Sequence, residues 1–262
     1  MTLRWIAEYR GEDGVAFRIG RDGDELVAEW PNVVTLRARR DGSSHVLTPA
    51  DGADPRDVDA IRRGSAEALL GHLRGELSVH AAAVAIGETA IVFLANSGGG
   101  KSTLCAAASA RPNARFIADD VVALDRRDGV WRASSRERDH WLHDDARAAL
   151  GLEIGEGKAA VAPGRNAEDA LPIAAFVALE FGDEEQMALS RCGLVDAFAI
   201  VIPQVVRFVL EEPEVVRTEI DLVSHLVEHV PVHRLVRPRN LRRLSESVDI
   251  VASIAKKGPD EP

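Results

Sequence analysis

The sequence predicts an α/β protein with a small β-rich region at its N-terminus. Three observations carry this prediction. The first fifty residues alternate apolar and polar positions in short runs that Gly and Asp separate. An apolar run over residues 88–94 leads directly into a glycine-rich loop, and an Ala-rich stretch without helix breakers follows that loop. Beyond it, apolar runs and amphipathic helical patterns alternate up to the C-terminus.

The elements of the N-terminal half follow from these patterns. Turn formers collect over residues 48–56, and the segment from there to Gly75 has apolar residues at helical spacing. Two strands joined at Gly87 come next, and a helix follows the glycine-rich loop. The sequence thus predicts strands over 77–86, 88–94, 115–118 and 121–124, a helix over 102–110, and a hairpin turn at 126–129.

The C-terminal half is less uniform. Residues 134–166 are polar and irregular around one short helix near 145–150, which is typical of a mobile or substrate-facing segment. The apolar stretch 195–206 fits either a helix or a strand. The remaining pattern predicts a strand over 171–181, an amphipathic helix over 214–230 that Pro231 ends, a strand over 232–236 and a helix over 241–254.

These elements suggest three parts of the chain. We expect a β-rich region over residues 1–54, a larger α/β domain over 55–257 and a frayed tail over 258–262.

Composition excludes several classes of function. The chain has 262 residues, of which 46% are hydrophobic and 28% charged, as in an ordinary globular protein with ample core. Acidic residues outnumber basic ones by 42 to 32, which gives a formal charge of −10. Proteins that neutralise a phosphate backbone usually carry the opposite sign, so we expect no nucleic-acid partner.

We expect neither an export signal nor a membrane segment in this chain. Residues 1–10 contain no continuous apolar stretch, so we expect no secretory signal and a cytoplasmic location. The longest apolar region, residues 197–206, contains Pro203 and is too short to span a bilayer, so we expect no membrane contact. Cys105 and Cys192 lie far apart and fit small buried apolar residues better than a redox pair or a zinc site.

The glycine-rich loop matches a P-loop. That pattern asks for Gly, four residues and then Gly-Lys-Ser/Thr; here Ala95 stands in the first position, where an alanine fits if φ stays negative. Lys101 would pair with the β- and γ-phosphates of ATP, and Ser102 would bind Mg²⁺ at the start of a helix. The nucleotide-binding residues are predicted to be Asn96, Ser97, Gly98, Gly99, Gly100, Lys101, Ser102 and Thr103.

Two carboxylates follow the next apolar run. Asp119 and Asp120 come after the strand that succeeds the P-loop helix, and a neighbouring parallel strand would place them beside the phosphates at the carboxyl edge of the sheet. One could bind the metal and one could accept a proton. An Asp-Asp pair at a strand end is often only a turn or cap.

His80 lies on the predicted strand that precedes the P-loop strand. A single histidine between apolar residues is usually a satisfied core histidine, so the residue alone indicates catalysis only weakly.

Three segments together resemble the core of the HPr kinase/phosphorylase superfamily. They are Ser78-Val-His80-Ala, Ser97-Gly-Gly-Gly-Lys-Ser102 and Phe116-Ile-Ala-Asp-Asp120. Lys101 follows His80 by 21 positions and Asp119 follows Lys101 by 18, as expected for that family. The resemblance is specific over residues 65–125 and looser up to residue 180.

The resemblance implies a fold and an activity. The fold would be a P-loop domain of the HPr-kinase/PEP-carboxykinase-like type, and the activity a Mg²⁺- and ATP-dependent transfer of the γ-phosphoryl group to a serine-type hydroxyl. It implies that His80 and Lys101 are active-site groups, that Ser102 holds Mg²⁺ and that Asp119 accepts the hydroxyl proton. Asp120 would support the metal or its water.

The chain departs from the bifunctional enzymes of this family. Their signature, an acidic residue closely followed by Arg-Gly-Leu-Gly-Ile, is absent, so the second metal carboxylate stays unidentified. The chain resembles the compact HPr-kinase-like proteins more closely, which include kinases of free serine or of a peptide end. The acceptor is left open as a serine-containing small molecule, peptide or protein, and so is the oligomeric state, with a homo-oligomer among the alternatives.

Other constellations offer further candidates. His225-Leu-Val-Glu-His229 matches a zinc peptidase pattern, but no third ligand is evident and we expect solvated helix histidines. A non-catalytic ATP-binding regulatory switch is the main alternative to a kinase. The weaker candidates are Asp144 and Asp145 for the missing carboxylate, Lys158 and Arg165 for phosphate or substrate contact, and the cationic run 233–243, which fits the solvated side of a strand and helix.

Overall fold

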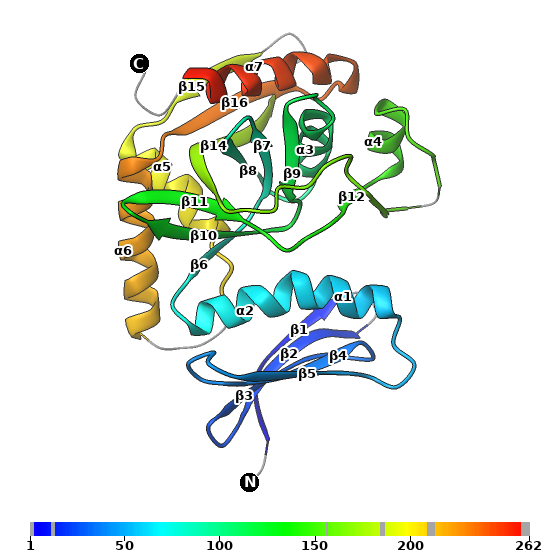
Figure 1. The fold of residues 1–262 in the computed structure, drawn as a ribbon, viewed down its shortest axis with the longest axis vertical. Coiled ribbons are helices and arrows are strands. Elements are labelled where there is room, and N and C mark those ends of the chain that lie inside the picture. The colour runs from blue at the N-terminus through cyan, green and yellow to red at the C-terminus, as the bar shows by residue number, and fades with distance from the viewer. Residues whose placement is uncertain (1–2, 12–13, 156, 184–186, 209–212, 258–262) are drawn as a thin grey trace. The chain divides into compact units, whose positions relative to one another are not determined.

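The computed structural model describes residues 3–11, 14–155, 157–183, 187–208 and 213–257. It is a mixed α/β structure with strand-rich sheets, as the sequence predicts (Figure 1). The chain divides into two compact units, one formed by residues 1–78 and 206–218 and the other by 79–205 and 219–262. This division differs from the predicted boundary at residues 54 and 55. The tail predicted to be frayed, 258–262, lies outside the described residues.

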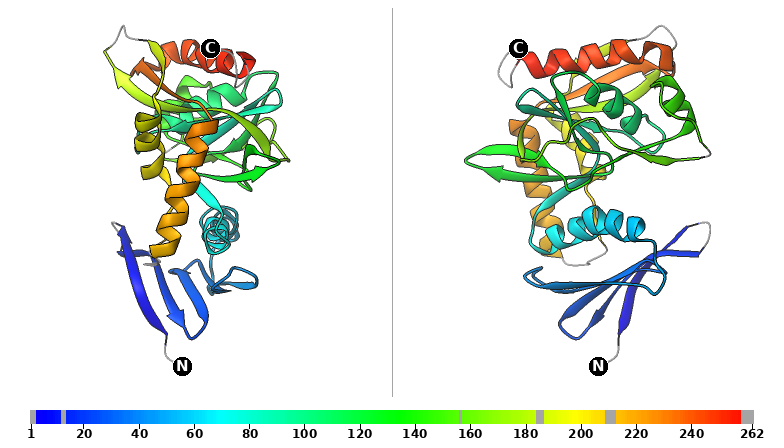
Figure 2. Two further views of the ribbon diagram at one scale, coloured as in Figure 1. Left: turned by 90° about the vertical axis from the view of Figure 1, so that its left-hand side faces the viewer. Right: turned by 45° about the vertical axis from the view of Figure 1, so that its right-hand side comes forward.

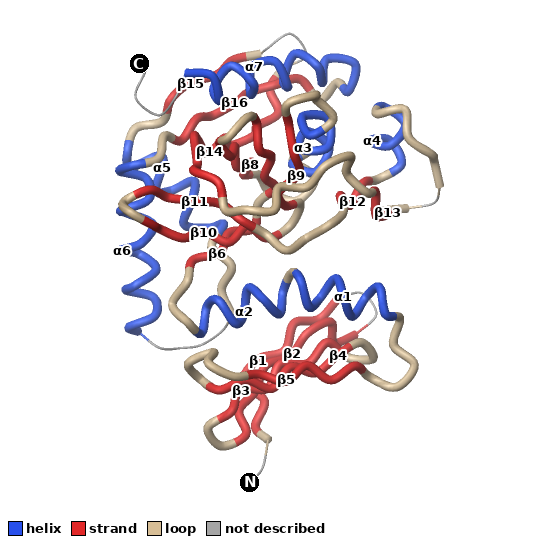
Figure 3. The backbone as a smooth tube through the Cα atoms, viewed as in Figure 1, coloured by secondary structure: helices blue, strands red, loops and turns tan. Residues whose placement is uncertain are grey.

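The first unit contains a five-stranded antiparallel meander in the order β1-β2-β3-β4-β5 (Figures 2 and 3). Alternation sets which side chains are buried: along β4, Val34, Leu36 and Ala38 are buried and the residues between them are not. The strands are β1 (Arg4–Gly11), β2 (Gly14–Asp22), β3 (Glu25–Trp30), β4 (Val34–Arg39) and β5 (His45–Pro49).

The helical segment after this sheet belongs to the same unit. It forms two helices, α1 (Pro55–Arg63) and α2 (Ser65–Leu73), where the sequence predicts one, because the backbone breaks at Gly64 with φ −100° and ψ −98°. The end of α2 lies against the β4–β5 turn: a Cβ on Gly42 would meet the Leu70 carbonyl at 3.0 Å. This packing joins residues 55–73 to the sheet of the first unit.

The second unit is built on a nine-stranded sheet. Seven strands follow one another in the order β6-β10-β11-β14-β8-β7-β9, and β16 pairs with both β14 and β15. Their bounds are β6 (Leu77–His80), β7 (Ala82–Ile86), β8 (Thr89–Leu94), β9 (Ala114–Ala118), β10 (Val121–Arg127), β11 (Val130–Ser134), β14 (Leu171–Gly182), β15 (Ala188–Arg191) and β16 (Val232–Pro238).

The directions of the strands bring the start of β7 and the ends of β8 and β9 to one edge of this sheet. The strands β8, β14 and β16 are parallel, whereas β7 lies between β8 and β9 and is antiparallel to both. The predicted strand 77–86 is therefore two strands, split at Ala81, and β9 is not the direct neighbour of β8 that the sequence predicts. The start of β7 and the ends of β8 and β9 still meet, because an antiparallel strand begins where its neighbours end.

Helices α3 (Lys101–Ser109) and α7 (Leu244–Lys257) cover one face of the sheet (Figure 1). Their apolar residues, including Leu104 and Val251, pack with Phe93 and Phe116 of the strands in one buried cluster. The remaining helices are α4 (Asp144–Ala149), α5 (Leu194–Val201) and α6 (Pro213–His229), with 3₁₀ turns at Ile202–Gln204 and Leu241–Arg243.

The segment 134–166 contains more structure than the sequence predicts. Besides α4 it forms a small two-stranded sheet from β12 (His140–Leu142) and β13 (Ala159–Val161). The hairpin turn predicted before it is confirmed: Asp128 and Gly129 have φ of 52° and 82° between β10 and β11. The part of the chain that the structure describes has no helix long and apolar enough to cross a membrane.

Candidate functional site

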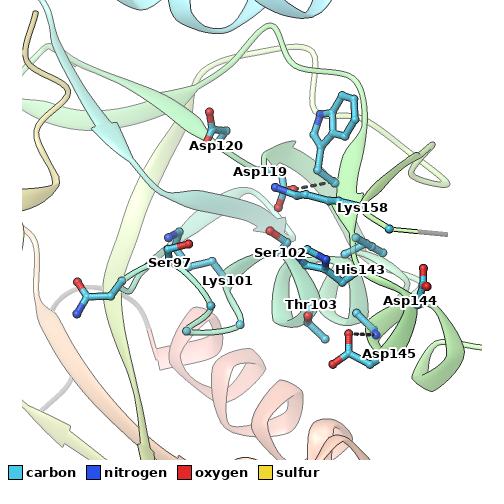
Figure 4. Close-up of a pocket in the computed structure, with 18 of the residues that line it drawn as sticks. Ser97, Lys101, Ser102, Thr103, Asp119, Asp120, His143, Asp144, Asp145 and Lys158 are labelled. Atoms are coloured by element: carbon cyan, nitrogen blue, oxygen red, sulfur yellow. Dashed lines mark hydrogen bonds between the residues drawn. The ribbon is translucent and has the colours of Figure 1, made fainter. Parts of the chain in front are cut away.

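A cavity of about 660 Å³ opens at the sheet edge where β7, β8 and β9 meet (Figure 4). The structure brings every residue of the predicted nucleotide, metal and catalytic set to its wall. These are His80, Asn96, Ser97, Gly98, Gly99, Gly100, Lys101, Ser102, Thr103, Asp119 and Asp120.

The glycine-rich loop, residues 95–100, turns sharply between β8 and α3. Gly98 and Gly100 have φ of 75° and 81°, a left-handed conformation that glycine adopts without steric cost. Gly99 is needed for room instead, because a Cβ there would lie 2.5 Å from the Ala95 Cβ. Ala95 is not among the described residues with positive φ, so an alanine fits at the first position of the motif.

The start of α3 leaves four backbone donors free. Within the described ranges, no acceptor is found for the N–H groups of Gly100, Lys101, Ser102 and Thr103, and the first helical bond runs from Leu104 to the Gly100 carbonyl. Unpaired N–H groups at a helix start carry partial positive charge and attract anions. The loop can therefore hold a phosphate group.

Lys101 is the buried cation of the cavity. Its side chain donates from Nζ to the Ala95 carbonyl at 2.7 Å, and Nζ lies 3.4 Å from Nε2 of His80. Burial lowers the pKa of Lys101, while Asp120 and Asp119 oppose that shift. A nearby anion would favour the charged ammonium further.

His80 links Lys101 to Asp120. Nδ1 of His80 lies 3.0 Å from Oδ1 of Asp120, and this hydrogen bond is the main reason that the pKa of Asp120 is lowered. The residue is the last of β6, just before β7, rather than on the strand next to the loop, and its side chain is half exposed. It is thus no core histidine.

Asp119 differs from Asp120 in being buried. Its Oδ2 accepts a hydrogen bond from the Trp141 N–H at 2.7 Å, while its Oδ1 has no partner among the described residues. Burial raises the pKa of Asp119, although Trp141, Ser102 and Lys158 act in the opposite direction. Figure 4 shows Lys158 extended toward Asp119.

The oxygen atoms around Ser102 fit a magnesium ion. Its hydroxyl and the carboxylate of Asp120 are hard ligands, and Mg²⁺ usually takes only one or two carboxylates together with phosphates and water. No cluster of three or more His, Cys, Asp or Glu side chains in the described parts of the chain could hold a metal without such help.

Glu137 was missed by the sequence analysis. Its carboxylate accepts three consecutive backbone N–H groups, from Asp119 at 2.6 Å, Asp120 at 3.1 Å and Val121 at 2.8 Å. Burial nevertheless raises its pKa to about 7. Glu137 fixes the turn that presents both aspartates, and its only sequence signal is an acidic residue within an otherwise irregular segment.

Arg237 was misjudged as part of a solvated cationic run. It is 5% exposed, at the end of β16, and donates from Nη2 to the Gly99 carbonyl at 3.0 Å and to that of Gly100 at 3.5 Å. Two residues further on, Arg239 lines the cavity, with its guanidinium 5.4 Å from the ring centre of Phe181.

Of the weaker candidates, some line the cavity and one does not. Asp144, Asp145 and Lys158 line the cavity, and Figure 4 places Asp145 with Thr103 at the end away from Asp120. Asp144 is ion-paired with Arg147. Arg165 is not a wall residue; its guanidinium donates to the carbonyls of Arg111 and Pro112.

Three other histidines have structural partners. His140 is buried, bonds through Nε2 to the Ser109 hydroxyl at 3.0 Å and has a pKa lowered by burial to about 4. His225 and His229 stack 4.0 Å apart, and Nδ1 of His225 accepts the indole N–H of Trp131.

No protein-family model matches the sequence, and no curated protein matches it. Among solved structures, the HPr(Ser) kinase/phosphatase from Coxiella burnetii is similar over 69% of this chain and 99% of its own, with 12% sequence identity and a TM-score of 0.35. This structural similarity is distant, so the roles proposed below rest on the geometry of the site itself.

Proposed function

We propose that this protein is a Mg²⁺- and ATP-dependent kinase that transfers the γ-phosphoryl group to a serine-type hydroxyl. The observation that carries the proposal is Asp119, a buried carboxylate with one free oxygen, at the same cavity wall as the free N–H groups of the glycine-rich loop. A P-loop domain of the HPr-kinase/PEP-carboxykinase-like type would combine these features.

The loop supports one orientation of the triphosphate. Backbone N–H groups at the start of α3 would hold the phosphates, and the lysine of such a loop reaches the β- and γ-phosphates. Because Nζ of Lys101 lies next to His80, the γ-phosphate end would lie toward His80 and Asp120. The nucleoside would then lie toward Thr103 and Asp145.

Ser102 and Asp120, both at the cavity wall, would hold Mg²⁺ together with the phosphates and water. The ion supplies charge neutralisation on the transferring phosphoryl group when it is bound. Asp120 suits this role because His80 keeps the pKa of its carboxyl low, so it stays ionised.

Asp119 would act as the general base. The acceptor hydroxyl gives its proton to the free Oδ1 while its oxygen forms a bond to the γ-phosphorus, and the bond from that phosphorus to the β–γ bridging oxygen breaks, leaving ADP. Burial raises the pKa of Asp119, which makes it a stronger base than an exposed carboxylate.

Transfer of radiolabelled γ-phosphate tests the proposal. Purified protein with Mg²⁺ and ATP should label one of three acceptor classes: free serine and related small hydroxyl compounds, serine peptides, or serine-containing proteins. Asp119→Asn should lower that rate by roughly 10²- to 10⁴-fold, the usual contribution of a general base. Asp125→Asn, which removes a carboxylate that is 34% exposed and paired with Arg127 on β10, outside the cavity wall, is the control and should leave the rate unchanged.

Two outcomes would overturn the kinase proposal. One is the absence of both ATP hydrolysis and acceptor labelling, with Asp119→Asn indistinguishable from the wild type. The other is ATP binding without turnover, which would instead favour a non-catalytic ATP-binding regulatory switch.

A further inference from the structure

Arg237 supports the glycine-rich loop from outside the cavity. It stands at the end of β16, where its register partner on the parallel strand β14 is Phe181. The guanidinium lies 4.9 Å from the centre of the Phe181 ring, and Nη2 reaches the carbonyl oxygens of Gly99 and Gly100. Strand, ring and loop thus hold one side chain in a fixed position.

These hydrogen bonds hold the carbonyl side of the loop whose N–H groups are free. Arg237 donates to the Gly99 carbonyl, and the Thr103 N–H, one of the orphan donors of the first helical turn, has no acceptor among the described residues. Gly100 completes the fit, because a Cβ at this position would clash with Nη2 of Arg237 and because its φ is 81°. The guanidinium therefore requires glycine at position 100.

The charge of Arg237 has no counter-ion. Within the described residues no carboxylate forms an ion pair with it, and its buried Nε has no hydrogen-bond partner. A buried cation without a counter-charge is electrostatically unfavourable. Burial accordingly lowers the pKa of Arg237, and no acidic group offsets that shift. An anion bound by the loop would supply the missing negative charge.

We propose that Arg237 is a positioning residue for nucleotide binding: it holds the glycine-rich loop in its anion-binding form, and its unpaired charge makes affinity rise with the charge of the bound phosphates. This inference rests on nucleotide binding, which is part of the proposed function, and does not require phosphoryl transfer.

Calorimetric titration with ATP and with ADP tests this inference. Arg237→Met keeps an unbranched apolar side chain but removes the charge and its donors, and it should weaken ATP binding by about tenfold or more, the usual effect of losing a charge-assisted contact. Because ATP carries more charge than ADP, the ratio of the two affinities should also fall. A purely structural role would weaken both nucleotides by the same factor.

Two further variants control for folding and charge. Arg237→Lys keeps the charge without the planar fork and should restore much of the ATP-to-ADP ratio but not the full ATP affinity. Arg234→Met changes an arginine of the same strand that is 41% exposed and paired with Glu180, and it should bind both nucleotides like the wild type. If Arg237→Met does not fold, the comparison of Arg237→Lys with the wild type decides, since it must lower ATP affinity at unchanged thermal stability.

The inference is overturned if Arg237→Met binds ATP as tightly as the wild type, or if it weakens ATP and ADP equally. These outcomes leave the kinase proposal intact. Conversely, if the variants change ATP and ADP affinity as predicted but no phosphoryl transfer occurs, the kinase proposal is wrong and the role of Arg237 is supported.

Discussion

Two turns at the same sheet edge are held in opposite ways, one through its backbone carbonyls and the other through its backbone N–H groups. In the glycine-rich loop, backbone carbonyls accept hydrogen bonds from a cation, Arg237, and the N–H groups that follow stay free. In the turn at Asp119 and Asp120, backbone N–H groups donate to the carboxyl group of Glu137, and the side-chain oxygens face the cavity. The loop that can bind anions is thus held by a cation through its carbonyls, and the turn that presents the two aspartates is held by a carboxyl group through its N–H groups.

The two supports differ in how they respond to pH. Arg237 stays charged near neutral pH, because a guanidinium is not deprotonated in proteins under such conditions, although burial lowers its pKa. Glu137 has a pKa of about 7 in the folded state against an ordinary value of 4.5. Only the acidic turn is therefore held by a group that titrates near neutrality.

The largest expected effect on stability concerns this titration. Because folding raises the pKa of Glu137, its stabilising contribution is complete below about pH 4.5 and is lost as pH rises through 7. In Glu137→Gln this loss disappears, so the variant should gain stability relative to the wild type between pH 4.5 and 7.5, by up to about 3 kcal/mol. Urea unfolding at both pH values measures the difference.

His140 provides the internal control, because its shift has the opposite sign. Folding lowers its pKa from 6.5 to about 4, so its contribution is present above pH 6.5 and lost as pH falls through 4. The stability of His140→Gln relative to the wild type should therefore increase as the pH falls. Parallel stability profiles for the wild type and both variants would contradict the assigned environments of the two groups.

Local sequence determined much of this site but not its supports. A strand, a glycine-rich loop and an Ala-rich helix are consecutive in the chain, so loop 95–100 and helix α3 could be predicted from periodicity and turn chemistry. His80 and Asp119 required a family resemblance, since each alone fits a bland role. Their convergence also depends on β7, the antiparallel strand that the sequence analysis merged with β6.

Glu137 and Arg237 could not be predicted, for a physical reason. Both act through backbone groups of distant segments, and Arg237 is 138 positions from Gly99. Such contacts depend on which strands are neighbours, and the parallel pairing of β14 with β16 has no local signature. A charged residue at a strand end is usually solvated, and this expectation failed for Arg237 because the loop covers it.

Lys101, which lines the cavity, can be compared with Arg237, which supports the loop from outside it. Arg237 would act on phosphate through the loop, whereas Lys101 would contact it directly, so Lys101→Ala should cost roughly 1.5 to 3 kcal/mol of ATP binding, or about ten- to a hundredfold in Kd. Calorimetric titration measures this loss, and thermal unfolding without nucleotide should show that the chain still folds. Unchanged ATP affinity would remove Lys101 from the proposed binding site.

Two glycine substitutions distinguish conformation from space in the loop. Gly98→Ala puts a Cβ where no atom lies within 4 Å but at a φ of 75°, which costs about 1 to 2 kcal/mol of strain. Gly99→Ala has no positive φ but would press against the Ala95 Cβ. We expect Gly98→Ala to weaken ATP binding by about tenfold and Gly99→Ala to shift Ala95 and lower thermal stability as well. Equal effects on affinity and stability would refute this distinction.

The smallest effect is expected at Arg37 in the first unit, which contrasts with Arg237. Arg37 is 42% exposed, and its guanidinium pairs with Asp22 and Glu25 on the surface of the meander. Exposed ion pairs contribute below about 1 kcal/mol, and salt screens them. Arg37→Gln should therefore change urea stability by less than that amount, with a smaller difference in high salt, and leave ATP affinity unchanged. If Arg37→Gln weakened ATP binding as much as Arg237→Met, burial and a missing counter-charge would not be what makes an arginine of this protein important for nucleotide binding.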